Sequence, residues 1–352
     1  MESLAKQFEN LVIQQQSIIA EKVVELQYAR QPEFWKPYGS SGRRLSVRDA
    51  GYHLPFLTEA VVSGDLQVFS EYVAWVKRLF RGLKFPDQVM IVTLECTKAV
   101  LAEMLPEGFH SVFVPVIDAG LAKMNEPLSE MPSYISPDAE TGIIAANYMN
   151  ALLAGDRHLA SKIVMDAVQN HVPVRSIYLD VFQASQYEIG RLWLNNEISV
   201  ATEHFCSAAT QSIMAQLYPY IFTTNRIGRT LVAACVGGEL HEMGIRMVTD
   251  FFEMEGWDTY YLGANSPVNS ILKAIEENNA DMVGLSAAMP FHRPLLRDTI
   301  HQIRASSTGK NVKILIGGNA FNAHNDRWMD YGADGYASNA GQAVKTANQL
   351  MN

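Results

Sequence analysis

The feature that most constrains the fold is a short loop that follows the apolar run Leu231–Val236. This run has the length and composition of a buried parallel strand, and a helical pattern resumes near Ile245. The loop carries the pattern Glu239-x-His241-x-x-Gly244. Because open α/β sheets bind ligands at the carboxyl ends of their strands, we expect His241 to lie at a binding site.

Two later apolar runs end in small residues, namely Ser286-Ala287-Ala288 and Gly317-Gly318. We expect these ends to lie beside His241 at the carboxyl edge of the sheet. The imidazole of His241 can hold a metal while its other ring nitrogen bonds a carboxylate such as Glu239. Gly244 lets a bulky ring approach the backbone, and the small residues leave a slot for a buried tail. The alternative is a plain doubly wound domain with a surface histidine.

These residues resemble the motif of the cobalamin-binding domain, which is Asp-x-His-x-x-Gly, then Ser-x-Leu, then Gly-Gly. Here 41 residues separate Gly244 from Ser286, and 28 separate Ala288 from Gly317, as the family spacing requires. Glu239 replaces the family aspartate, and Ala288 replaces its leucine. The resemblance implies a cobalamin whose cobalt is bound from below by His241, the predicted metal ligand.

Residues 227–352 alternate apolar runs with helical patterns, which predicts a doubly wound parallel sheet. We expect strands near 231–236, 258–262, 282–286, 312–316 and 335–338, and helices near 241–254, 267–278, 293–306, 322–331 and 340–350. Outside the motif, we expect His292, His301 and His324 to be solvated.

Residues 140–226 carry four helical patterns joined by short breaks, which predict a four-helix bundle. Its helices are expected near 141–153, 156–170, 173–191 and 198–218. Residues 125–139 contain three prolines and read as a linker. The part before it, 1–124, is expected to be helical, with a loop at 31–44 and a helix starting at the capping box 46–49.

Within the bundle, Trp193 is followed by nine residues and then Glu203-His204. This resembles the Trp-x9-Glu-His signature of photoreceptor-type adenosylcobalamin domains, the family of the CarH and LitR repressors. The resemblance implies that Trp193, Glu203 and His204 cap the upper corrin face and enclose an adenosyl group. Leu194 stands where those repressors have a histidine that binds cobalt after photolysis. The alternative is a core tryptophan beside a solvated polar pair.

The N-terminal segment resembles the globin-like, bilin-sensing domains that are fused to cobalamin domains in photocobilins. The resemblance implies a bound biliverdin, which needs cations for its propionates and acceptors for its pyrrole N–H groups. The candidate residues are Arg43, Arg44, Asp49, Tyr52 and His53. The alternative is that Tyr52 and His53 belong to the core and that the arginines are solvated. Cys96 is expected to be buried in a helix rather than bonded to a bilin.

Composition restricts the class of protein further. The net charge of −9 argues against binding along a nucleic-acid backbone, and no apolar run is long enough to cross a membrane. The three cysteines are scattered and fit a reducing cytoplasm. No catalytic domain is visible, so the chain is not expected to be an enzyme.

The fold expected is therefore α + α/β: an N-terminal globin-like domain, a four-helix bundle and a doubly wound cobalamin-binding domain. The function expected is light sensing, in which loss of the adenosyl group changes quaternary structure or partner contacts. We expect a homo-oligomer, a dimer or larger, with 3–29 as its surface, and an unknown downstream effector protein. The alternatives are a corrinoid protein that carries methyl groups for a methyltransferase, and a light-independent cobalamin sensor.

Overall fold

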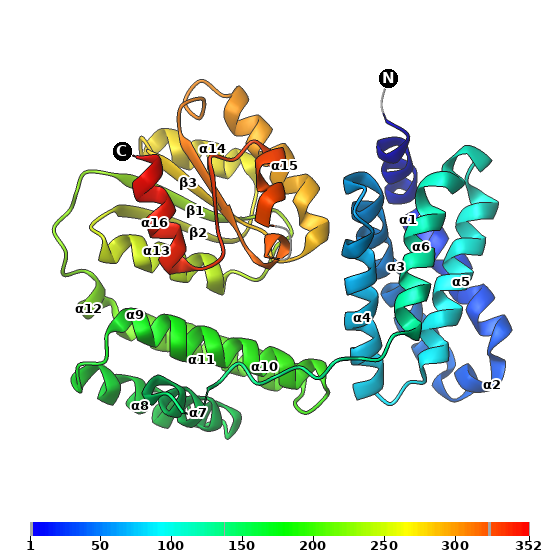
Figure 1. Ribbon diagram of the computed structural model, residues 1–352, viewed down its shortest axis with the longest axis horizontal. Helices are drawn as coiled ribbons and strands as arrows, with labels where there is room; N and C mark the ends of the chain where they lie inside the picture. The colour runs from blue at the N-terminus through cyan, green and yellow to red at the C-terminus, as the bar shows by residue number, and fades with distance from the viewer. Residues whose placement is uncertain (1–2, 137, 323–324, 352) are drawn as a thin grey trace. The chain divides into compact units, whose positions relative to one another are not determined.

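The computed structural model describes residues 3–136, 138–322 and 325–351, which divide into two compact units (Figure 1). The first unit comprises Met1–Met131 with Leu194–Glu197, and the second comprises Pro132–Trp193 with Ile198–Asn352. None of the helices in the described residues is both long enough and apolar enough to cross a bilayer.

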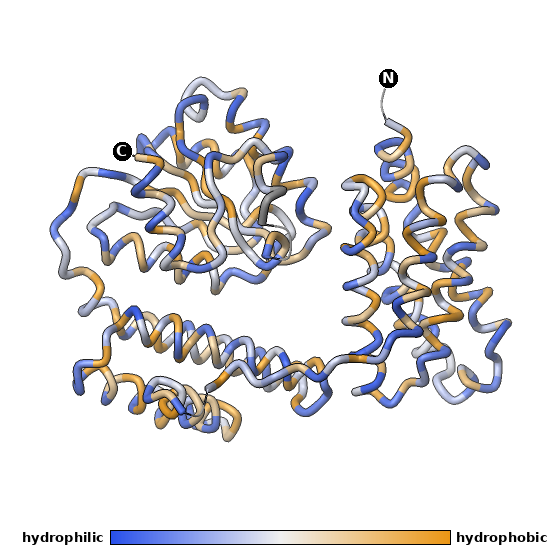
Figure 2. Tube along the Cα trace, viewed as in Figure 1, coloured by the Kyte–Doolittle hydropathy of each residue, from blue (hydrophilic) through white to orange (hydrophobic). Residues whose placement is uncertain are grey.

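The first unit is entirely helical within the described residues. Its elements are α1 (Leu4–Arg30), α2 (Pro32–Trp35), η1 (Lys36–Tyr38), α3 (Gly39–Ser63), α4 (Leu66–Gly82), α5 (Asp87–Met104), η2 (Glu107–Phe109) and α6 (His110–Asn125). The hydroxyl of Ser3 caps α1 by accepting from the backbone of Lys6, and α3 ends at Gly64, which has a left-handed φ of 65°. Apolar and polar residues alternate along these helices, as buried and exposed faces require (Figure 2).

The loop expected at 31–44 is wrong, and so is the helix start expected at 46–49. The chain forms α2 and η1 there, and α3 already begins at Gly39. A Cβ on Gly42 would lie 2.3 Å from the Cβ of Tyr38, so a glycine is needed for this tight helical start. The glycines were interpreted as breakers, whereas one of them permits close packing.

The helical part of the second unit precedes its sheet. Its elements are α7 (Glu140–Leu153), α8 (Arg157–Gln169), α9 (Val174–Ser176), η3 (Ile177–Gln183), α10 (Ala184–Leu194), α11 (Val200–Gln216) and α12 (Tyr218–Ile221). Asp156 caps α8 and Ser199 caps α11, each through a side-chain oxygen. The helix expected at 173–191 is a run of three segments, of which η3 is a π-helix.

The sheet has five parallel strands in the order β2-β1-β3-β4-β5, the order of flavodoxin-like doubly wound folds. Its strands are β1 (Thr230–Val236), β2 (Asp258–Ser266), β3 (Met282–Ser286), β4 (Lys313–Gly317) and β5 (Gly335–Ala337). The longer helices around it are α13 (Met243–Met254), α14 (Val268–Glu277), α15 (Arg293–Ala305) and α16 (Ala340–Leu350). The prediction of a helical N-terminal region followed by a C-terminal parallel sheet is confirmed.

One helix expected in the sheet domain is not formed as such. In place of a helix near 322–331 the chain has three-residue η5 (Asn319–Phe321) and the 3-10 segment η6 (Asn325–Tyr331), while 323–324 lie outside the described residues. A further 3-10 turn, η4 (Pro290–His292), precedes α15. Phe321 and Tyr331, near the two ends of this stretch, pack against each other in the core on one face of the sheet, whereas Met329 is exposed.

The two faces of the sheet bury different partners. Val232, Ala234 and Val236 of β1 face the core that includes α14 and α15, whereas Leu231, Ala233 and Cys235 face the core that includes α13, α16 and the helical bundle (Figure 1). Alternate residues of a strand point to opposite faces, so an all-apolar strand is covered on both sides. The bundle thus shares one continuous core with the sheet.

Candidate functional site

The loop between β1 and α13 is held by backbone hydrogen bonds. The amide of Glu239 donates to Val236 (3.1 Å), the amide of Asn265 donates to the carbonyl of Glu239 (2.8 Å), and the amide of Gly238 donates to Oδ1 of Asn265 (2.7 Å). Gly238 has a φ of 78°, which favours glycine. The end of β2 therefore fixes the loop that carries His241.

The carboxylate of Glu239 is fully buried and accepts five hydrogen bonds. Oε1 accepts from the amide of His241 (2.9 Å) and from its Nδ1 (2.5 Å). Oε2 accepts from the amides of Ala288 (2.7 Å) and Met289 (3.1 Å) and from Nδ1 of His292 (2.9 Å). Burial alone would raise the pKa of Glu239, but the donors from His241 and His292 hold it well below its usual range.

The ring of His241 points outward while its Nδ1 is engaged. Its side chain is 65% exposed, and the bond to Glu239 leaves Nε2 as the nitrogen that can bind a metal. The hydrogen bond to Glu239 raises the pKa of His241. The sequence suggested a carboxylate such as Glu239 as the partner of this ring nitrogen, and the hydrogen bond is formed with Glu239.

His292 is not solvated as expected; its side chain is only 13% exposed. The η4 turn directs its ring to Glu239, and a Cβ on Gly238 would lie 3.3 Å from its Nε2, so the missing side chain makes room for the ring. Sequence reasoning missed this residue because its partner lies 53 positions away. His301 is exposed, and His324 lies outside the described residues.

The small residues predicted to line a slot lie on adjacent strands. Ser286 pairs in register with Gly317, so both lie at the same level of the sheet edge. Gly318 has a φ of 100°, and a Cβ there would lie 2.2 Å from the carbonyl oxygen of Ala287. Ala288, in the next position, gives its amide to Glu239. The segment after β3 is thereby hydrogen-bonded to the loop that carries His241.

The helical bundle supplies polar groups on the same unit. Nδ1 of His204 lies 2.6 Å from Oε2 of Glu203, and the hydroxyl of Ser207 donates to Oε1 of Glu203 (2.9 Å). The charge of Glu203 also acts on His241 and raises its pKa, which relates the first turn of α11 to the loop after β1. Trp193 is half-buried at the end of α10.

Sequence reasoning did not single out two further residues of this network. Gln186 of α10 accepts from Ser207 (3.0 Å), and Gln211 of α11 donates to Oε1 of Glu242 (3.2 Å), next to His241 in the chain. Both are ordinary helix residues in the sequence. Only their side-chain contacts show that they belong to the polar network.

The five candidate residues of the first unit all lie on α3. Arg43, Arg44, Asp49 and Tyr52 are exposed, whereas His53 is buried, with Nδ1 2.7 Å from the hydroxyl of Tyr72. The guanidinium of Arg48 lies over the ring of Tyr52 (5.8 Å), and the ring of Tyr72 stacks with that of exposed Trp75. The negative charge of Asp49 acts on Tyr72, so these residues share one region of α3 and α4.

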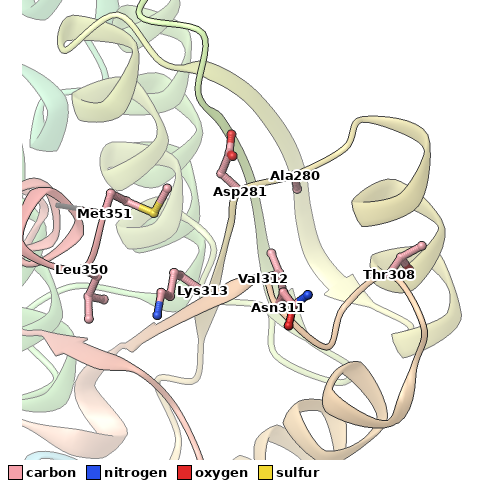
Figure 3. A pocket seen from close by; sticks show the side chains of 8 residues that line it. All are labelled: Ala280, Asp281, Thr308, Asn311, Val312, Lys313, Leu350 and Met351. Atoms are coloured by element: carbon pink, nitrogen blue, oxygen red, sulfur yellow. The ribbon is translucent and has the colours of Figure 1, made fainter.

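A separate pocket of about 390 Å³ lies at the opposite edge of the sheet, where β3 and β4 begin (Figure 3). Asp281 and Lys313 lie in its lining near the C-terminal residues Leu350 and Met351. None of the residues predicted from the motifs lines this pocket. It therefore does not contribute to the site around His241.

The donor set around His241 fits a cobalamin. The described residues contain no group of three or more His, Cys, Asp or Glu side chains that could hold a metal ion. A corrin supplies four nitrogen ligands itself, so one outward imidazole with its other nitrogen on a carboxylate is sufficient. A Cβ on Gly244 would meet no atom within 4 Å, so the backbone at this glycine of the motif borders open space.

Comparison with family models agrees with this geometry. A model described as B12 binding domain matches residues 229–345, and a second model with the same description matches 144–218. A model described as Phycobilisome protein matches residues 4–124. The prediction of a cobalamin-binding domain is confirmed.

Curated relatives match about half of the chain. Dimethylamine corrinoid protein 1 of Methanosarcina acetivorans is 31% identical over 166 residues, which is 47% of this chain and 75% of that protein. Dimethylamine corrinoid protein 3 of Methanosarcina mazei is 30% identical over 47% of this chain and 96% of its own length. The solved monomethylamine corrinoid protein of Methanosarcina barkeri matches with a TM-score of 0.53 at 21% identity, over 59% of this chain and 99% of that chain, which shows a shared fold.

These relatives overturn the light-sensor prediction, which is wrong. They are corrinoid proteins named for methylamines, and they agree with the alternative of a methyl-carrying corrinoid protein. The signature at Trp193 was interpreted from its resemblance to photoreceptors, but a tryptophan at the end of α10 and a polar pair in the first turn of α11 do not define what a bound cofactor does. The prediction that the chain is not itself an enzyme is confirmed by the same relatives.

Proposed function

Since the chain belongs to the family of B12-binding corrinoid proteins, we propose that it carries methyl groups for a methyltransferase, using a cobalamin held by His241. One observation carries the proposal. The outward imidazole of His241 has its Nδ1 on the buried carboxylate of Glu239, in a domain related to corrinoid proteins named for dimethylamine. Bound cobalamin supplies the cobalt that accepts and releases the methyl group.

Each residue of the site has a distinct task. Nε2 of His241 would bind the cobalt of a bound cobalamin, and Glu239 would keep the proton on Nδ1 and make the ring a stronger donor. The open space at Gly244 would admit the edge of the corrin, and the sheet edge at Ser286, Gly317 and Gly318 would hold the nucleotide tail of the cofactor. Ala288 supports Glu239 through its amide rather than through its side chain.

The upper ligand is a methyl group in this proposal, and an adenosyl group is the second candidate. The polar network of Glu203, His204 and Ser207 favours the adenosyl form, because these groups can bond ribose hydroxyls while Trp193 offers an apolar wall. Mass spectrometry of cobalamin extracted from the purified protein distinguishes the two forms. Recovery of a single form identifies the ligand that Trp193 and Glu203 accommodate.

We propose that the first unit binds a linear tetrapyrrole such as biliverdin, and that this unit has the globin-like fold. The match of residues 4–124 to the Phycobilisome protein model supports this. Arg43 and Arg44 are exposed cations for propionates, Asp49 is an exposed acceptor for pyrrole N–H groups, and Tyr52 offers an exposed ring. Buried His53 would act through Tyr72 rather than by direct contact.

Binding of a tetrapyrrole is tested by adding biliverdin to the full chain and measuring far-red absorbance after gel filtration. Asp49→Asn and Tyr52→Ala should lower the bound pigment. Lys98→Ala on α5, whose side chain is half-buried and pairs with Asp118 of α6, is the control away from α3 and should bind as the native chain does. Absence of pigment in the native chain would exclude this part of the proposal.

The methyltransferase is the proposed partner protein, and self-association through α1 is a second proposal. Ile13 and Ile18 are exposed on α1, which suits a contact between copies. Sedimentation of the native chain and of an Ile13→Lys/Ile18→Lys variant measures the effect. Equal mass of both forms at high concentration would exclude this surface.

The central proposal is tested with protein charged with methyl-labelled cobalamin. Incubation with cell extract of the source organism should remove the label from the protein much faster than from free methylcobalamin, because the partner recognises the carrier. His241→Ala should lose tight cobalamin binding, while His301→Ala, at an exposed position of α15, should keep it. Label that stays on the native protein as long as on free cofactor would refute carriage.

A further inference from the structure

Glu239 joins two loops of the sheet edge through its two oxygens. Oε1 serves the loop after β1 and bonds His241, whereas Oε2 serves the segment after β3 and bonds His292 and two amides. Every acceptor direction of this carboxylate is therefore used. A rotation of the carboxylate would break bonds to both segments at once.

From this arrangement we propose that His292 is a positioning residue for the axial ligand: through Glu239 it fixes the orientation and tautomer of the His241 ring. The inference rests on the proposed cobalamin site and adds a residue to it. His292 supplies the only side-chain donor to Oε2 among the described hydrogen bonds.

The two histidines on this carboxylate have opposite surroundings. Both rings direct Nδ1 to Glu239, but the side chain of His241 is 65% exposed and that of His292 is 13% exposed. Nε2 of His292 faces the backbone at Gly238, and its ring lies 4.4 Å from that of Phe291. His292 is therefore enclosed and supports the ligand, while the Nε2 of His241 remains open to the metal.

The length of Glu239 matches this role. An aspartate has one methylene group fewer, so its carboxylate could not reach both rings at 2.5 and 2.9 Å without movement of a loop. The glutamate, the glycine at 238 and the histidine at 292 thus form one set. The absence of a side chain at Gly238 leaves space for the ring of His292. This ring donates to Glu239, and Glu239 in turn accepts from the ring of His241.

The test uses the full chain and two variants that differ only in where they place a donor. His292→Asn puts an amide N–H near the position of Nδ1, and His292→Gln puts it near Nε2, away from Glu239. We expect His292→Gln and His292→Ala to bind hydroxocobalamin roughly ten-fold more weakly, at the low end of the effect of outer-shell partners on metal affinity. His292→Asn should stay near the native affinity, and His301→Ala should equal it.

A readout that needs no cofactor accompanies the affinities. Nitrogen-15 NMR of histidine-labelled apoprotein should show His241 with its proton on Nδ1 in the native chain and in His292→Asn, and a mixture of tautomers in His292→Gln. Equal affinities and equal tautomers in the Asn and Gln variants would overturn the inference. Failure of the native chain to bind hydroxocobalamin would instead remove the proposed function, while the tautomer comparison would still decide the role of His292.

Discussion

Lowering the pH should destabilise the first unit through the buried ring of His53. This ring is enclosed between α3 and α4, and its Nδ1 lies 2.7 Å from the hydroxyl of Tyr72. Burial lowers the pKa of His53 from its ordinary 6.5 to about 4. At a pH between these two pKa values, His53 is protonated in the unfolded chain but not in the folded chain, so acid favours unfolding.

The magnitude follows from the two pKa values, which differ by about 2.5. Each pH unit in this window changes the free energy of unfolding by about 1.4 kcal/mol for one proton, so the total is about 3 kcal/mol. The contribution is fully present above pH 6.5 and is lost as the pH falls to 4. A loss of this size is a large fraction of the stability of a small domain.

The assay is urea unfolding of the full chain between pH 7.5 and 4, with pulse-labelling mass spectrometry of peptides from α3 and α4 to report on this unit. His53→Gln keeps an amide that can bond the hydroxyl of Tyr72 but cannot take up a proton in this range. The difference between native and variant chains isolates His53 from the carboxylates. Equal pH slopes for the two chains would refute the reasoning.

Three further predictions concern the second unit. Gly318→Ala should cost at least about 2 kcal/mol in urea unfolding, because the new Cβ meets the carbonyl oxygen of Ala287 at 2.2 Å with φ at 100°; a loss below about 0.5 kcal/mol would contradict it. Gly244→Ala should instead raise stability by about 0.5 kcal/mol as a helix residue without a clash, yet weaken cobalamin binding in a titration, and unchanged binding would count against a corrin there. Burial raises the pKa of Asp250 to about 6, so its ionisation costs stability as the pH rises from 3.8 through 6. Asp250→Asn should therefore gain up to about 3 kcal/mol at pH 7.5 while still accepting from Tyr178, and the gain should vanish at pH 3.5; equal gains at both pH values would contradict this.

The strands of the sheet were predictable because each is an apolar run covered on both faces. The expected runs 231–236 and 282–286 differ from β1 and β3 by no more than one residue. The stretches that failed, 31–44 and 322–331, contain glycine or polar residues whose conformation depends on tertiary contacts. At Gly42 that contact is the side chain of Tyr38, which no local pattern shows.

Only the part of the site that is formed by residues close together in the sequence could be predicted. Glu239 and His241 are two residues apart, so their pairing could be proposed from the motif. The donors from Ala288 and His292 come from another strand end, about 50 residues later, and need the parallel order of β1 and β3 to meet Glu239. No periodicity encodes such a contact, and a histidine before a helix has many possible roles.

The light-sensor prediction failed for a related reason. Trp193, Glu203 and His204 can describe the shape and polarity of a group above a corrin, but the same shape serves a sensor and a carrier. What distinguishes the two is which protein meets the bound cofactor, and that information lies on a surface rather than in a motif. The relatives, which are named as dimethylamine corrinoid proteins, favour the carrier over the sensor.

The two sides of the site differ in a way that suits exchange of an upper ligand. Below, the carboxylate of Glu239 is fully buried and every lone pair is used, so the metal ligand is held in one orientation. Above, the ring of His204 is 74% exposed and its partner Glu203 keeps contact with solvent. In the proposed carrier, the fixed ring of His241 would hold the cobalt of a bound cobalamin, and the exposed groups of α11 could rearrange when a partner approaches. The fixed carboxylate of Glu239 and the exposed polar groups of α11 therefore agree with the proposed role of a carrier.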